Sequence, residues 1–72
     1  MAAPAPVPCS EKRDLIMRFT AAVQECNRLQ TDQIKALLRS EGFFLETEIA
    51  QAMERRERTK YAVMEHQRQH GC

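Results

Sequence analysis

Residues 38–45, which read LRSEGFFL, decide the fold of this chain. Gly42 lies in the middle of this stretch, and Phe43 follows it directly. Glycine adopts the left-handed conformation that ends many helices, and an apolar residue just beyond it commonly packs back onto the last turn. The stretch therefore predicts a turn between two helices, with Gly42 as the residue that ends the first helix.

Both flanks of this turn lack glycine and proline over long distances, and the second flank is rich in residues that favour helices. Ser10 is a good N-cap for the first helix. At 1.5 Å per residue the two segments measure about 45 Å and about 38 Å, lengths that suit antiparallel packing. We expect an all-α fold, an antiparallel helical hairpin of two long helices over about 11–40 and 44–69. The alternative is three helices, with a break near residues 30–32, where Thr and Asp could cap a new helix.

The length of 72 residues allows one domain. All three prolines fall in residues 1–10, which carry no charged residue, so we expect a disordered Ala/Pro-rich tail there. The hairpin then occupies residues 11–70, and residues 71–72 form a frayed C-terminus. The apolar runs are too short for a membrane span, and acids near residue 11 do not fit a mitochondrial presequence.

Two apolar patterns compete along the first helix. One has a period of 3.6 residues from Ile16, and because it continues in phase to Leu37 and Leu38 we favour a single helix over this segment. The other spans residues 15–29 with the alternating spacing of four and three that marks a coiled coil, but it lasts only two heptads. If the chain folds back at Gly42, two residues that face each other across the helices should have residue numbers that sum to about 84. We therefore expect Val23 to lie opposite Tyr61.

Candidate chemistry is sparse. His66 and His70 are spaced for one helical face and Cys72 could add a thiolate, but a structural zinc needs four ligands, so we expect no metal. Cys26 falls on the apolar stripe, where a thiol behaves as a small hydrophobe. Because no nucleophile, acid–base pair or phosphate loop accompanies these residues, we expect neither an enzyme nor a cofactor nor a small-molecule substrate.

Charge argues against a dedicated nucleic-acid binder, because the net charge is only +1. One basic cluster keeps this possibility as the alternative function, although Glu54 and Glu57 interrupt it. Its members are Arg55, Arg56, Arg58 and Lys60.

The apolar side chains indicate protein binding instead. They are spread too widely for one hairpin to bury, and surplus apolar surface usually marks a partner site. Three cysteines without paired spacing suggest reduced thiols, hence the cytoplasm or the nucleus. We expect a small interaction subunit or assembly factor of a larger complex, whose partner is another protein chain, in a homo- or hetero-oligomer. The predicted partner-binding residues are Leu15, Ile16, Phe19, Val23, Leu29, Tyr61, Val63 and Met64.

Overall fold

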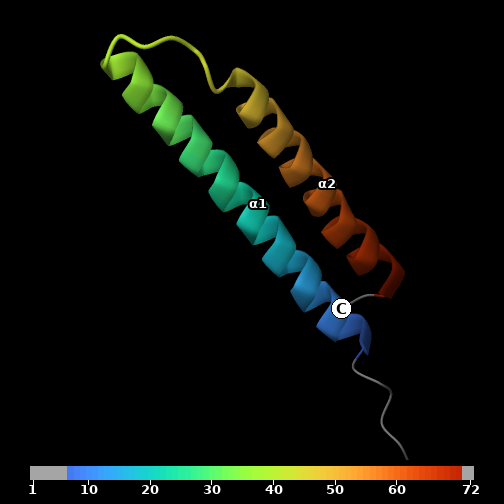
Figure 1. Cartoon of the computed structure of the whole chain (residues 1–72). Helices are drawn as coiled ribbons and strands as arrows, with labels where there is room; N and C mark the ends of the chain where they lie inside the picture. Colours follow the sequence, from blue (N-terminus) through green and yellow to red (C-terminus); the bar gives the residue numbers. More distant parts are fainter. Residues whose placement is uncertain (1–6, 71–72) are drawn as a thin grey trace, which may run out of the picture.

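The computed structural model describes residues 7–70 and the side chains of residues 10–69. It shows two helices, α1 (Val7–Leu38) and α2 (Glu46–His70), that run antiparallel and pack along their lengths (Figure 1). The predicted all-α hairpin is confirmed. Because α1 continues without interruption through residues 30–32, the three-helix alternative is not the structure. Residues 1–6 of the expected tail and the expected frayed end at 71–72 lie outside the described residues.

Helix α1 begins at Val7, four residues before the predicted start, so residues 7–10 are helical. Pro8 is compatible with this position because the amides of the first turn have no partner within the helix, and a missing N–H there costs nothing. Ser10 is consequently inside the helix rather than at its N-cap. The proline content of the segment therefore does not mark the helix boundary.

The two helices meet along a seam of residues spaced alternately by four and three. This seam is the coiled-coil pattern of residues 15–29, extended through Gln33 to Ala36, and all its members are buried or half-buried. Helices packed with this spacing interlock their side chains as knobs into holes. The seam comprises Leu15, Phe19, Ala22, Cys26, Leu29, Gln33 and Ala36 from α1, and Leu45, Ile49, Ala52, Arg56, Thr59, Val63 and His66 from α2 and the residue before it.

The pairing of facing residues that we expected from the sequence is therefore wrong. Ile34 is 59% exposed and Leu38 is 81% exposed, whereas Cys26, Leu29 and Ala52 form the centre of the core. The facing positions sum to about 82 rather than 84, as the contact between Cys26 and Arg56 shows. Each residue turns a helix by about 100°, so even this small shift points Tyr61 outward instead of toward α1.

Helix α1 ends in a Schellman motif that Ser40, not Gly42, makes possible. Ser40 has a φ of 64°, in the left-handed region. Its N–H donates to the carbonyl of Leu37 at 3.0 Å, and the N–H of Glu41 donates to the carbonyl of Ala36 at 2.8 Å. These two bonds satisfy carbonyls at the helix end that have no partner within the helix. The predicted helix-ending role of Gly42 thus belongs to Ser40.

Gln33 joins the seam to the loop and to the start of α2. Its side-chain Nε2 donates to the carbonyl of Gly42 at 2.8 Å, and its Oε1 accepts from the N–H of Leu45 at 2.9 Å. The side chain is buried, with only 5% of the residue exposed. Leu45 is the residue whose carbonyl accepts the first bond of α2, from Ile49 at 2.8 Å. The side-chain amide of Gln33 therefore binds both the middle of the turn, at Gly42, and the residue before α2, Leu45.

The role of Ser40 predicts a stabilising substitution. Ser40→Gly removes the steric cost of a side chain at positive φ and should raise the free energy of unfolding by about 1 kcal/mol. Urea denaturation at fixed protein concentration measures it. Gly42→Ala is the matched comparison, because a Cβ at Gly42 meets nothing within 4 Å, and we expect a change below about 0.5 kcal/mol. The opposite ranking would mean that Gly42 ends the helix.

The role of Gln33 predicts a local effect on hydrogen exchange. Gln33→Met keeps the side chain's length but removes both hydrogen bonds, worth about 1–2 kcal/mol together, so the Leu45 amide should exchange about tenfold faster. The control is Gln30→Met, which changes an exposed residue one turn earlier. Amide exchange followed by NMR distinguishes them, and equal rates at Leu45 in both variants would contradict this role.

Candidate protein-interaction surface

The seam divides the hairpin surface into two unlike faces. Residues that follow a seam position on α1 lie on one side, and residues that precede it lie on the other. Ile34 and Leu37 of α1 share the first side with Met53 of α2, because all three line one groove. We call this side the apolar face, and it comprises Ile16, Val23, Ile34, Leu37, Met53 and Met64.

The groove lies on the apolar face next to the turn and has a volume of about 550 Å³. Phe43 closes it at the loop, and Ile49 and Ala50 contribute from α2. Glu46 is the one ionisable residue of its lining. The groove therefore suits apolar side chains of another protein better than a polar substrate.

The structure divides the predicted partner-binding residues between the seam and the surface. Ile16 and Met64 lie exposed on the apolar face, and Val23 is half-buried there. Tyr61 is 58% exposed, with the Nζ of Lys60 4.9 Å from its ring centre. The other four predicted residues belong to the seam between the helices, and they are Leu15, Phe19, Leu29 and Val63.

The set of partner-binding residues predicted from the sequence omits four apolar residues that line the groove. A usable signal was present, because once the coiled-coil spacing is taken as the seam, its flanking positions follow. Leu37 and Met53, for example, each come directly after a seam residue. The missed residues are Ile34, Leu37, Phe43 and Met53.

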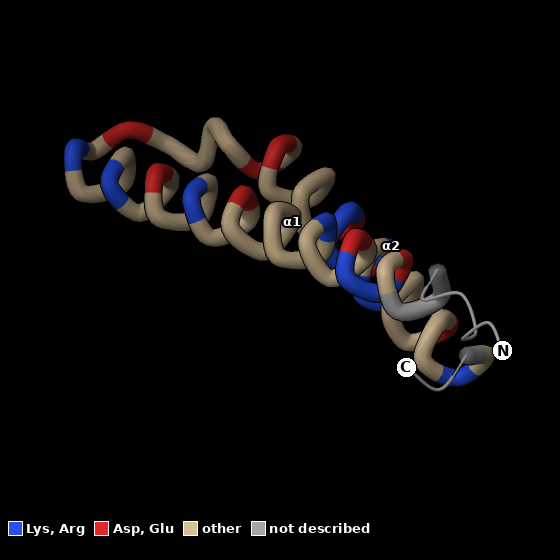
Figure 2. The backbone as a smooth tube through the Cα atoms, turned by 90° about the horizontal axis from the view of Figure 1, so that it is seen from below, with Lys and Arg blue, Asp and Glu red and all other residues tan. Residues whose placement is uncertain are grey.

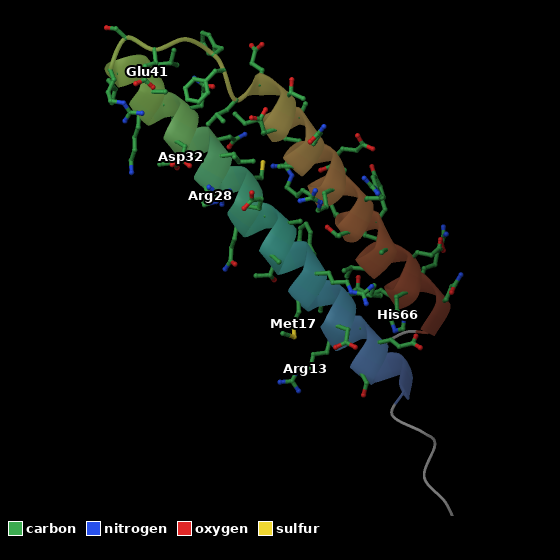
Figure 3. The ribbon with its side chains drawn as sticks, in the orientation of Figure 1. Arg13, Met17, Arg28, Asp32, Glu41 and His66 are labelled. Carbon is green, nitrogen blue, oxygen red and sulfur yellow. The ribbon has the colours of Figure 1, made fainter. Side chains whose placement is uncertain are left out.

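The opposite face is charged and pairs its charges within the chain. Basic and acidic residues alternate along the part of α1 near the turn (Figure 2). Arg28 contacts Glu25 at 2.6 Å and Asp32 at 3.3 Å, and it projects away from α2 (Figure 3). Hydrogen bonds from Arg28 lower the pKa of Glu25, and the charges of Arg28 and Arg55 lower it further.

The structure does not bring the four residues of the basic cluster together. Arg56 turns into the seam, where its Nη1 lies 3.7 Å from the Cys26 sulfur. Lys60 pairs with Glu57 at 2.8 Å, whereas Arg55 and Arg58 border a separate hollow on the charged face. Arg58 also contacts Glu54 at 3.4 Å. The cluster is therefore split over three directions of the helix.

His66 is buried, with 6% of the residue exposed. It points toward the beginning of α1 (Figure 3), and its Nδ1 lies 3.8 Å from the Glu11 carboxylate. The side chain of His70 and all of Cys72 lie outside the described part of the chain. Among the residues that are described, no group of three or more His, Cys, Asp or Glu side chains could hold a metal ion.

Comparison with protein-family models, with curated proteins and with solved structures gives no match for this chain. Within the described residues, neither helix is both long enough and apolar enough to cross a membrane.

The ion pairs predict how stability depends on pH. Hydrogen bonds from basic neighbours lower the pKa of Glu25, Glu41, Glu57 and Glu65 below the ordinary value of 4.5. A lowered pKa in the folded state gives stability above the unfolded value, and that stability is lost as pH falls through the folded values. We expect the midpoint temperature of thermal unfolding to decrease when the pH is lowered below 4.5. The decrease should be smaller in high salt, because salt already screens these exposed pairs. Circular dichroism melts test this, and a midpoint that stays constant down to pH 3 would contradict it.

Proposed function

We propose that this protein is a non-enzymatic, all-α interaction subunit that joins a larger protein assembly through its apolar face. The observation that carries the proposal is the separation of the surface into a charged face and an apolar one. Ile34, Leu37 and Met53 surround one groove and are 59%, 38% and 40% exposed, although large apolar side chains of this kind are usually buried. Soluble monomers rarely expose such side chains contiguously unless the patch binds something.

Covering this face would supply a useful association energy. A large apolar side chain contributes about 1.5–3 kcal/mol when it is fully buried, and these side chains begin roughly half exposed. The groove residues and Met64 would together yield about 5 kcal/mol, before the cost of lost rotational and translational freedom is subtracted. This favours a partner that covers the whole face rather than a small ligand in the groove alone.

Three further features support the proposal. The groove lining offers one carboxylate, Glu46, and no partner acid, base or nucleophile for a reaction. Cys26 is fully buried, as expected of a structural thiol in a reducing compartment, so we place the protein in the cytoplasm or nucleus. The nucleic-acid alternative has weaker support, because the basic cluster is split and its arginines contact carboxylates such as Glu54 and Glu57.

Site-specific photocrosslinking tests the proposal. A photoreactive amino acid replaces Ile34 on the apolar face or Arg28 on the charged face of the tagged full chain, expressed in cells. We expect discrete adducts from position 34 and few from position 28, because only the apolar face would lie within reach of a partner. Equal labelling at the two positions, or none at position 34, would contradict the proposal.

A further inference from the structure

We propose that the occupant of the apolar face is a second copy of this chain, so that two hairpins form a four-helix bundle. This inference rests on the proposed interaction function and names its partner. A two-helix hairpin has one seam, and here large apolar residues such as Ile34 and Met53 lie beside that seam instead of in it. Stacking two hairpins on their apolar faces would turn those residues into a second core.

The area of the face matches what a stable dimer needs. Helix α2 has 25 residues, which corresponds to about 38 Å. Two helices side by side are about 20 Å wide, so the face measures about 750 Å² on each copy. Stable protein interfaces bury about 800 Å² per partner. A single added helix would cover only about half of the face, whereas a second hairpin of the same length covers all of it.

The order of residues along the face also fits a copy of itself. Near the turn, the face carries Ile34, Leu37 and Met53, and near the opposite end it carries Ile16 and Met64. Apart from Val23, the residues between them are polar, and they include Thr20, Asn27, Glu57 and Lys60. A two-fold axis either along or across the hairpin superposes apolar ends on apolar ends and the polar middle on the polar middle. Such self-complementarity is the requirement for a symmetric dimer.

Charge does not oppose this pairing in the middle of the face, and the groove near the turn carries one carboxylate, Glu46. The charged residues in the middle of the face are Glu57 and Lys60, which already form an ion pair at 2.8 Å. The middle of the face is therefore neutral, and a second copy brings no excess of like charge to it. The charged face, with Arg28 paired to Glu25 and Asp32, would remain in water on the outside of the bundle.

Sedimentation of the purified full chain tests the inference. The chain has a mass of 8.3 kDa, and we expect the wild type to sediment with twice that mass at about 100 µM. Ile34→Gln combined with Met53→Gln should weaken the dimer by about tenfold or more, because each copy then buries two polar amides. The matched control is Leu38→Gln, which makes the same kind of change at a position that is 81% exposed and away from the groove. Circular dichroism confirms that the variants remain helical.

The wild-type mass keeps the inference falsifiable even where a variant fails to fold. A helical wild-type chain that remains monomeric up to about 100 µM would overturn the dimer. The proposed function would survive that result if the photoreactive residue at position 34 gave adducts with a different protein. If the Leu38→Gln control weakens the dimer as much as the groove variant does, the assignment of the apolar face as the dimer interface would also be overturned.

Discussion

The seam that joins the two helices, in which small and polar side chains alternate with large apolar ones, is the constraint on which the rest of this structure depends. Ala22, Cys26, Ala36 and Ala52 leave little space between the helices, and all four are buried. Larger seam residues such as Leu29 and Ile49 pack against these small ones. Ile34 and Met53 each follow a seam residue directly, so they lie beside the seam and form part of the apolar face.

The polar members of the seam make the hairpin specific as well as close-packed. Gln33 could not be buried without partners for its amide, and the carbonyl of Gly42 and the N–H of Leu45 supply them. Because both partners lie at the turn, this pair of bonds sets where α2 begins relative to α1. The hydroxyl of Thr59 is likewise satisfied within its own helix, by the Arg55 carbonyl at 2.9 Å. Of these bonds, the two made by Gln33 connect different segments and so contribute to the register of the helices.

Sequence reasoning predicts the hairpin well and the register less well, for a physical reason. Two long segments without glycine or proline, matched in length around residues 38–45, leave little alternative to two antiparallel helices. The seam was harder to predict because a search for apolar periodicity does not count the polar residues Gln33, Arg56 and His66 as buried positions. Their burial depends on partners elsewhere in the fold. The stripe from Ile16 contains seam residues such as Cys26 together with residues such as Ile34 that lie beside the seam.

The helix end shows the same limit on a smaller scale. Glycine favours positive φ, so Gly42 was the natural candidate, but the Schellman hydrogen bonds place the left-handed residue at Ser40. Only the three-dimensional course of the loop, held by Gln33, decides between them. For the candidate interaction surface, the surplus of apolar residues predicts that an exposed apolar surface exists. The position of Leu37 and Met53 on that surface can be predicted only once the seam is known.

The two helices are joined by this seam and not by the stripe that begins at Ile16. Nuclear Overhauser contacts between side chains measure this directly in solution. We predict strong contacts from the Ala52 methyl group to Leu29 and Cys26, which form one core cluster. Contacts between Val23 and Tyr61 within one chain, without those of Ala52, would contradict the account.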